Sequence, residues 1–262
     1  MELAFWQIVV LAVVQGLTEF LPISSSGHLV VLAAFMTDGD PSRLDLADIS
    51  VVLHVGTLFS ILVFYCDRIW RLLGQDRRAI RPLILGTLPA VVIGLTIEFT
   101  CEQLIESPLL AGLMLPVTGL ILLWAARRLE GTREYVDLTD RQALLIGLSQ
   151  AVAILPGISR SGATISAGVR LGLSPRSAAT FSFLLAIPAI AGAGLLKAVS
   201  LLREAGPTTA WPYLLGGGVI SFAVGLLALW WLINWLERGR LRLFAGWCIP
   251  LGIAVTIWQL LR

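Results

Sequence analysis

Six long apolar segments constrain this chain more than any other feature of its sequence. Each is close to the ~20 residues that a helix needs to cross the hydrocarbon core of a bilayer. With 57% hydrophobic and only 14% charged residues, the chain has too little polar surface for a water-soluble globule. The sequence therefore predicts an all-α polytopic membrane protein. The six expected transmembrane segments are 48–66, 82–99, 108–126, 177–201, 212–235 and 243–261.

The charged residues and the cysteines exclude several other classes of protein. The net charge is only +2, and the basic residues lie in short loops rather than in one patch, so nucleic acid is not expected as a partner. The three cysteines are far apart and form no CxxC pair, which indicates neither a disulfide framework nor a zinc site. They are Cys66, Cys101 and Cys248.

A polar stretch from Gln15 to His28 interrupts the first apolar run. Residues 3–14 are apolar but too short to span a bilayer, and Pro22 and Gly27 break the run before a second short apolar piece. This pattern predicts a helical hairpin that enters the membrane and returns to the same side. Irregular backbone of this kind is tolerated at membrane depth only where protein or a water-filled cavity surrounds it.

A second polar stretch repeats the first at an offset of 135 residues. It runs from Gln150 to Thr164, and residues 142–155 and 163–173 flank its central loop. The first stretch carries an acid, Glu19, and the second carries a base, Arg160. The matching pairs are Gln15 and Gln150, Ser24 and Ser159, Ser26 and Ser161, and Gly27 and Gly162.

The offset predicts two repeats, about 1–130 and 136–262, within a single membrane domain 1–262. Each repeat contains one re-entrant hairpin, which adds no net crossing, and three transmembrane helices. The second repeat must therefore begin on the opposite face of the membrane, as in the inverted repeats of many transporters. The two hairpins then enter from opposite faces and can meet near the midplane.

The arginines support this topology. Four of the 19 Lys and Arg fall on one predicted face, namely Arg43, Lys197, Arg203 and Arg262, and Arg160 lies in the hairpin loop. By the positive-inside rule, the arginine-rich face is cytoplasmic and both termini lie outside. The 14 arginines on the arginine-rich face are Arg68, Arg71, Arg77, Arg78, Arg81, Arg127, Arg128, Arg133, Arg141, Arg170, Arg176, Arg238, Arg240 and Arg242.

Arg160 is the candidate ligand for an anion. It lies where a helix is expected to begin, and free backbone N–H groups and the helix dipole favour an oxyanion at such a point. Its planar guanidinium suits phosphate oxygens, and Ser159, Ser161 and Thr164 add hydroxyl donors nearby. The alternative is that Arg160 only pairs with a carboxylate and so joins the two repeats.

Glu19 and Gln15 are the candidate metal ligands. They lie one helical turn apart and so face the same way. Their oxygens suit Mg²⁺ or Ca²⁺, and Glu19 could instead act as a general base. The alternative is a protonated Glu19 whose hydrogen bonds a neighbouring helix satisfies.

The three serines that follow Glu19, Ser24 to Ser26, permit two interpretations. They could include a nucleophile, or they could simply break the helix. His28 could protonate a leaving phosphate or hold a transferred one, although a lone membrane histidine is more often a packing residue. His54, inside a transmembrane segment, is interpreted as such a packing residue.

Both polar stretches resemble known motifs. Gln15-Gly-Leu-Thr-Glu19-Phe-Leu-Pro-Ile-Ser-Ser-Ser-Gly-His28 and Pro156-Gly-Ile-Ser-Arg160-Ser-Gly-Ala-Thr164 look like the two motifs of the integral-membrane undecaprenyl-diphosphate phosphatases of the bacitracin-resistance type. The resemblance covers nearly the whole chain, including the segment Phe181-Ser-Phe-Leu-Leu-Ala-Ile-Pro188. Gln15 stands where many relatives have Glu, which leaves Glu19 as the only carboxylate of the first motif.

The resemblance implies an enzyme that removes the terminal phosphate from undecaprenyl diphosphate with a divalent cation, Mg²⁺ or Ca²⁺. It implies Glu19 as metal ligand or base, with Gln15 as second metal ligand, and Ser25 as nucleophile. His28 is the implied acid or phosphate partner, and Arg160 the phosphate ligand. The full set of expected substrate-binding residues is Ser24, Ser26, Gly157, Ser159, Arg160, Ser161 and Thr164.

The resemblance also implies a place for the protein. We expect a multi-pass protein of the bacterial cytoplasmic membrane whose site opens toward the outer, periplasmic face, where a polyprenyl diphosphate keeps its tail in the bilayer. The sequence leaves the oligomeric state open, with a homodimer as the candidate assembly. Two rival functions are a carrier of phosphate or of a lipid phosphate, because transporters use inverted repeats with broken helices, and a non-catalytic scaffold.

Overall fold

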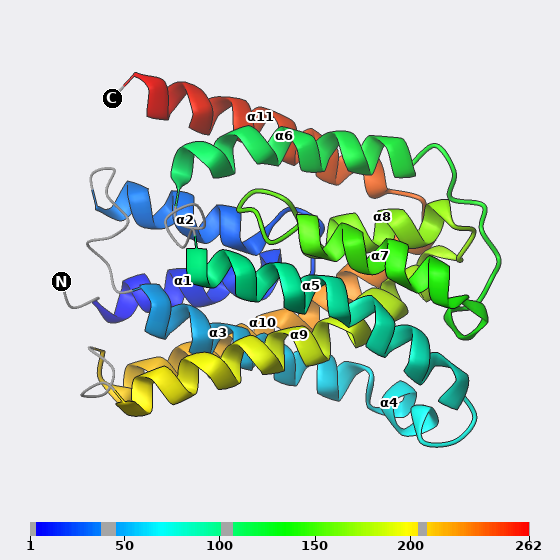
Figure 1. The fold of residues 1–262 in the computed structure, drawn as a ribbon. Helices are drawn as coiled ribbons and strands as arrows, with labels where there is room; N and C mark the ends of the chain where they lie inside the picture. Colours follow the sequence, from blue (N-terminus) through cyan, green and yellow to red (C-terminus); the bar gives the residue numbers. More distant parts are fainter. Residues whose placement is uncertain (1–3, 38–45, 101–106, 204–208, 262) are drawn as a thin grey trace.

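A computed structural model describes residues 4–37, 46–100, 107–203 and 209–261 of the chain. These ranges fold into a bundle of helices joined by short connections (Figure 1). The helices, in chain order, are α1 (Phe5–Thr18), α2 (Ser25–Met36), α3 (Leu46–Phe64), α4 (Cys66–Leu72), α5 (Ile80–Thr100), α6 (Pro108–Ala125), α7 (Asp140–Val152), α8 (Arg160–Arg170), α9 (Pro175–Arg203), α10 (Trp211–Glu237) and α11 (Leu241–Leu260), with single 3-10 turns at η2 (Arg77–Ala79) and η4 (Tyr135–Asp137).

Six helices account for the predicted transmembrane segments. Among the described residues, α5, α6, α9, α10 and α11 are each long and apolar enough to cross a bilayer. The sixth is a bent pair, in which Ile49–Phe64 of α3 is followed by the short α4 (Cys66–Leu72) at an angle of 72°. The prediction of six transmembrane helices is therefore confirmed, with one bent span that the sequence did not indicate.

The two polar stretches form the predicted hairpins, α1–α2 and α7–α8. None of these four helices exceeds 14 residues, which is too short to cross the hydrocarbon core. Each return helix begins at a capping serine. Ser24 Oγ accepts a hydrogen bond from Gly27 N at 3.3 Å, and Ser159 Oγ accepts one from Gly162 N at 3.0 Å.

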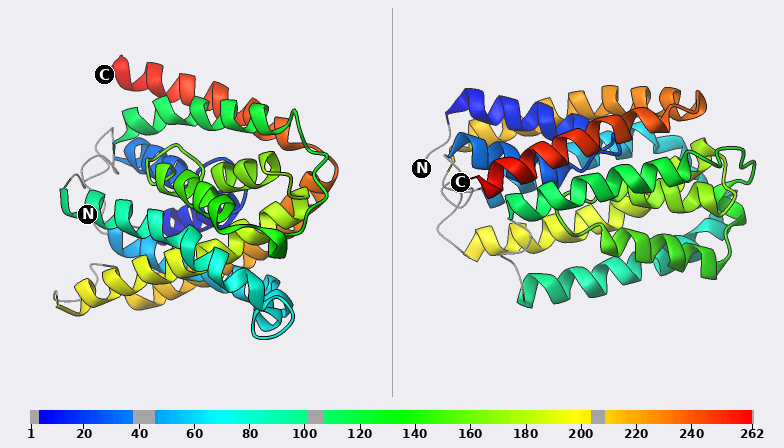
Figure 2. Two further views of the ribbon diagram at one scale, coloured as in Figure 1. Left: turned by 45° about the vertical axis from the view of Figure 1, so that its right-hand side comes forward. Right: turned by 90° about the horizontal axis from the view of Figure 1, so that it is seen from above.

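The hairpins enter the bundle from opposite ends. In Figure 1, α1 runs inward from the end that holds both termini and α2 returns to that end, whereas α7 and α8 do the same from the other end. The return helices begin at Ser25 and Arg160, and the entry helices at Phe5 and Asp140, which is the same offset of 135 residues. The packing repeats as well, because α1 packs on α10 and α7 packs on α5 (Figure 2). The structure thus confirms the inverted repeat.

The outside of the bundle is apolar, as expected for a surface that faces lipid. Inside, the helices approach closely at small residues. A side chain at Gly56 of α3 would collide with the carbonyl oxygen of Gly218 on α10, and one at Gly147 of α7 with that of Gly86 on α5. The exposed large residues include Leu88 and Val92 on α5, Leu120 on α6, Leu227 and Trp230 on α10, and Trp247 and Ile253 on α11.

The arginine-rich connections share one end of the bundle, as predicted (Figure 1). Tyr135 joins two of them there, because its buried hydroxyl donates a hydrogen bond to the Asp76 carboxylate. Burial and the neighbouring Asp76 raise the pKa of Tyr135, so the hydroxyl keeps the proton that it donates. Arg43 and Arg262, predicted at the opposite end, lie outside the described residues. Within the described ranges, Cys66 and Cys248 are free thiols.

Candidate active site

The tips of the two hairpins touch, and they do so twice. A methyl group added at Gly27 would lie 2.9 Å from Gly157 Cα, and one added at Gly162 would lie 3.3 Å from Pro22 Cβ. The offset of 135 residues exchanges these two contacts, since it relates Gly27 to Gly162 and Pro22 to Gly157. Such an exchange is the mark of a contact across a two-fold axis. The hairpins therefore meet about a local two-fold axis inside the bundle.

Glu19 and Arg160 form an ion pair at this meeting point. Arg160 Nη2 lies 2.5 Å from Glu19 Oε1, although 141 positions separate the two residues in the chain. The carboxylate is buried, with 7% of Glu19 exposed, and the guanidinium is half-buried. The inverted repeat predicted this meeting, and the structure confirms it.

Each of the two charges is disfavoured by its own helix. Glu19 caps the carboxyl end of α1, where the helix dipole is negative, and Arg160 is the first residue of α8, where it is positive. The ion pair offsets both penalties. Arg160 Nη1 is buried and has no hydrogen-bond partner within the described part of the chain. A guanidinium nitrogen and the amino end of α8 are thus both suited to an anion.

Ser25 lies directly beside Glu19. Its hydroxyl donates a hydrogen bond of 2.6 Å to Glu19 Oε2, and the Ser25 side chain is only partly buried. A carboxylate in contact with a hydroxyl is the arrangement that a general base and its nucleophile require. Of the three serines in this stretch, Ser25 is the one that the structure connects to the ion pair.

Ser24 and Gly157 hold the hairpins together. Ser24 Oγ accepts a hydrogen bond from Gly157 N at 3.2 Å, and Ser24 has a φ of 73°, which is unusual for a residue with a side chain. Gly157 has a φ of 93°, and a side chain there would collide with the carbonyl oxygen of Ala111 on α6. Ser26 Oγ lies 3.4 Å from Ser24 Oγ. These predicted substrate-binding residues therefore support the backbone around the ion pair.

The hydroxyls of the second motif are bonded within the protein. Ser159 Oγ caps α8 and lies 3.2 Å from Ser161 Oγ. Thr164 Oγ1 donates a hydrogen bond of 2.8 Å to the Arg160 carbonyl and lies 2.6 Å from Ser182 Oγ on α9. All three hydroxyls thus fix the start of α8, so a role in binding substrate would require them to change partners.

The hydrogen bonds of the His28 ring are made to the Ser24 backbone and to Trp247 rather than to the ion pair. Its Nδ1 lies 2.7 Å from the Ser24 carbonyl oxygen, and its Nε2 accepts a hydrogen bond of 2.9 Å from Trp247 Nε1 on α11. A carbonyl oxygen only accepts, so the proton of the ring is on Nδ1. For His28 to act on a phosphate, as predicted, Nε2 must exchange Trp247 for that phosphate.

Residues 8–254 match the family described as bacitracin resistance protein BacA. The chain belongs to this family.

Curated BacA-type relatives match over nearly their full length. A protein of Rhodopirellula baltica named undecaprenyl-diphosphatase is 50% identical over 256 residues, which cover 97% of this chain and 98% of that protein. Proteins of the same name from Desulfatibacillum aliphaticivorans and Moorella thermoacetica are 40% and 38% identical, and each alignment covers 96% of this chain and 97% of the relative.

One residue of this BacA-family site was missed in the sequence. His54, on α3, was interpreted as a packing residue, but its Nε2 lies 3.6 Å from Glu19 Oε2. Its Nδ1 lies 2.7 Å from the Ser50 carbonyl oxygen, so the ring is held with Nε2 toward the carboxylate. The only available signal was a polar residue in an apolar helix, which by itself does not show which neighbour it faces.

The donor set at Glu19 fits a divalent cation in part. Gln15 is fully buried, its Nε2 donates a hydrogen bond of 3.1 Å to Glu19 Oε2, and its Oε1 has no partner among the described residues. Those residues contain no group of three His, Cys, Asp or Glu arranged to hold a metal. A single carboxylate with one amide oxygen suits Mg²⁺, which commonly keeps waters and takes its other ligands from a substrate phosphate.

Proposed function

We propose that this chain hydrolyses undecaprenyl diphosphate to undecaprenyl phosphate and inorganic phosphate. The observation that carries this proposal is the pair of Glu19 and Arg160 at the hairpin tips, with Ser25 bonded to the carboxylate and a guanidinium nitrogen left without a partner. The names of the curated relatives and their full-length similarity support the same substrate.

The reaction follows from the positions of these groups. Arg160 binds the terminal phosphate through Nη1 while Nη2 stays on Glu19. Ser25 Oγ attacks the terminal phosphorus, its proton passes to Glu19, and the bond from phosphorus to the bridging oxygen breaks, which releases undecaprenyl phosphate. Water then hydrolyses the phosphoserine and releases inorganic phosphate. Positioning and charge stabilisation supply most of the catalysis in phosphoryl transfer.

Glu19 and Gln15 are the residues that would hold Mg²⁺ or Ca²⁺ in this reaction. A bound cation supplies charge neutralisation for the diphosphate. Gln15 Oε1, which is buried without a partner in the described ranges, supports this assignment, because such an oxygen gains an electrostatic partner from a cation.

The lipid carrier reaches the site from within the bilayer. Its tail stays among the apolar outer surfaces of the helices, and its head group meets the partly exposed side chains of Ser25, His28 and Arg160. The proposed membrane is the bacterial cytoplasmic membrane, with the arginine-rich end inside by the positive-inside rule and the site served from the periplasmic leaflet.

The first test removes the guanidinium. We expect Arg160→Ala to abolish phosphate release from undecaprenyl diphosphate with Mg²⁺. Because the change also leaves Glu19 buried and unpaired, at a cost of about 3–5 kcal/mol, folding is checked by size-exclusion profile and thermal unfolding in detergent. Arg160→Lys keeps the charge but loses the planar fork, so we expect it to fold and to retain only a small fraction of activity. Undiminished phosphate release by either folded variant would remove Arg160 from the mechanism.

The second test concerns the nucleophile. We expect Ser25→Ala to lower the rate of phosphate release by about a hundredfold or more, because the attacking oxygen is lost. Ser149→Ala is the matched control, since Ser149 Oγ only donates to the Ile146 carbonyl one turn earlier on α7. Near-normal turnover by Ser25→Ala would show that water attacks the phosphorus directly.

A further inference from the structure

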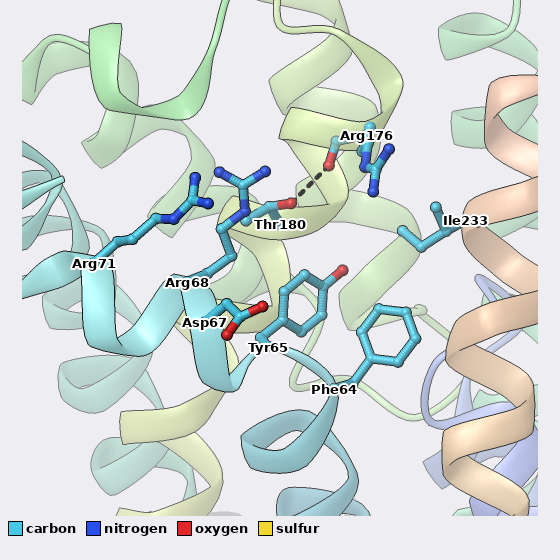
Figure 3. A pocket seen from close by; sticks show the side chains of 8 residues that line it. All are labelled: Phe64, Tyr65, Asp67, Arg68, Arg71, Arg176, Thr180 and Ile233. Atoms are coloured by element: carbon cyan, nitrogen blue, oxygen red, sulfur yellow. Dashed lines mark hydrogen bonds between the residues drawn. The ribbon is translucent and has the colours of Figure 1, made fainter. Parts of the chain in front are cut away.

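A second cluster of cationic side chains surrounds a cavity at the arginine-rich end of the bundle. The cavity has a volume of about 220 Å³ and lies between the bend after α3, the start of α9 and the last turns of α10 (Figure 3). Arg68 and Arg71 reach it from α4, and Arg176 reaches it from the first turn of α9. Two elements far apart in the chain, α4 and α9, thus bring three guanidinium groups to one small space.

The charges around this cavity are unbalanced. Asp67 is the one carboxylate in the lining, against three arginines. Arg176 Nη1 also lies 3.3 Å from Glu237 Oε1, but both side chains are largely exposed, and such surface pairs are weak. Among the described residues, neither Arg68 nor Arg71 has a carboxylate within 4.0 Å. The cavity therefore presents an excess of positive charge in the fork geometry that matches phosphate oxygens.

Tyr65 adds a buried donor to these charges. Only 5% of the residue is exposed, and its hydroxyl has no hydrogen-bond partner in the described part of the chain. The ring packs against Phe183, with centroids 5.9 Å apart, and Figure 3 shows the hydroxyl directed between Arg176 and Ile233. The hydroxyl of Thr180, which also lines the cavity, donates to the Arg176 carbonyl, so the Tyr65 hydroxyl is available to an acceptor in the cavity.

The cavity is separate from the ion pair at the hairpin tips. Tyr65 comes directly after α3 and lies eleven positions beyond His54, a separation of about 16 Å along the helix axis. Phe64 and Ile233 give the cavity an apolar wall. The cavity combines arginines, a hydroxyl donor and an apolar wall at the end of a transmembrane bundle. This combination suits the phosphate of a lipid, and the arginines alone also suit a free phosphate.

We propose that this cavity binds the phosphate group of an anionic ligand at the arginine-rich end of the bundle. The ligand is either an acidic phospholipid, with Phe64 and Ile233 beside its glycerol and first acyl carbons, or inorganic phosphate from the aqueous phase. Arg68, Arg71 and Arg176 neutralise the phosphate, and the Tyr65 hydroxyl donates a hydrogen bond to it. The proposal does not rest on the hydrolase activity, because none of these residues contacts Glu19 or Arg160.

The test measures binding to the full-length protein in detergent. Phosphatidylglycerol adducts are counted by native mass spectrometry against phosphatidylcholine, and inorganic phosphate alone is titrated by calorimetry. The two cavity variants are the double change Arg68→Ala with Arg71→Ala, and Tyr65→Phe, which removes only the hydroxyl. The matched control is Arg240→Ala with Arg242→Ala, which removes two exposed charges from the same end of the bundle.

We expect the cavity double variant to bind at least about tenfold more weakly and Tyr65→Phe a few-fold more weakly, because charged hydrogen bonds contribute more than neutral ones. The control should bind as the unchanged protein does, and all variants should release phosphate from undecaprenyl diphosphate at the normal rate. Binding of phosphatidylglycerol alone identifies a lipid site, and binding of inorganic phosphate with the same dependence on Arg68 and Arg71 identifies a free anion.

Three outcomes would overturn the proposal. In the first, neither probe binds the unchanged protein more strongly than phosphatidylcholine does. In the second, both cavity variants bind as well as the unchanged protein. In the third, the Arg240 and Arg242 control loses as much affinity as the cavity double variant, which would show that general surface charge attracts the anion.

Discussion

At the scale of single residues, the candidate site joins groups that their own surroundings disfavour. Glu19 is a buried carboxylate at the carboxyl end of a helix, and Arg160 is a guanidinium at an amino end. Either one alone would destabilise its hairpin, so each needs the other while no substrate is bound. In the proposed reaction, a phosphate at Arg160 Nη1 would meet a guanidinium that the carboxylate already holds in place, which lowers the entropic cost of ordering the site.

His54 provides the sharpest test at this scale. We expect His54→Ala to lower kcat for phosphate release by about ten- to a hundredfold with little change in KM, because the change loosens Glu19 without touching the phosphate ligand. His54→Gln should restore much of the rate, since its amide nitrogen can donate a hydrogen bond to the carboxylate. Steady-state kinetics decides the matter, and equal rates for His54→Ala and the unchanged protein would show that the histidine only packs.

The residues of the site could be predicted from sequence to different degrees. Glu19 and Arg160 could be identified because a charge at membrane depth is energetically costly and usually functional, and the repeat predicts that the two lie together. The partner of His54 could not be predicted, because it depends on how α3 is rotated about its axis. The hydrogen bond from Trp247 to His28 could not be predicted either, since the two residues are 219 positions apart and the repeat does not relate them.

At the scale of elements, the contact between the two hairpins depends on a close approach of their backbones. Gly27 faces Gly157 with no room for a further carbon atom, and Ser24 bonds across the same gap. The sequence indicated both hairpins, and α1 extends beyond the apolar run of residues 3–14 to Thr18. The polar residues Gln15 and Thr18 are helical because the surrounding bundle buries them and supplies partners, which local hydropathy does not register.

A single methyl group tests the hairpin contact. Gly27→Ala would place Cβ 2.9 Å from Gly157 Cα, so the tips must move apart and the ion pair must lengthen. We expect about a hundredfold loss of phosphate release, because displacements near 1 Å at a reacting centre have effects of this size. Gly246→Ala on α11 is the control, since nothing lies within 4 Å of the added carbon. Similar activity of the two variants would contradict the close contact.

At the scale of the whole molecule, the two ends of the bundle differ in charge although the backbone is a repeat. The connections at one end carry most of the arginines, and on the positive-inside rule we propose that this end faces the cytoplasm. The sequence predicted at which end of the bundle each connection lies, because every transmembrane helix takes the chain to the opposite end and each repeat has three of them. The bend between α3 and α4 was not predicted, because hydropathy alone cannot separate a straight span from a broken one.

Cysteine labelling tests this orientation. Ala210 precedes α10 and Arg240 follows it, so these two exposed residues lie at opposite ends of that helix. In a background without the native cysteines, we expect a membrane-impermeant maleimide applied to spheroplasts to label Ala210→Cys but not Arg240→Cys. Lysis should then expose Arg240→Cys to the reagent. The reverse pattern would mean that the molecule has the opposite orientation in the membrane. Labelling of both residues from outside would contradict the crossing of the membrane by α10.

The doubled contact of Gly27 with Gly157 and of Gly162 with Pro22 has a consequence for chain continuity. Two surfaces that recognise each other reciprocally do not need a covalent tether between them. If the chain is divided within the connection between α6 and α7, each fragment keeps the surface that the other one binds. Fragments 1–130 and 131–262, produced together, should therefore co-purify and release phosphate, whereas either fragment produced alone should be inactive.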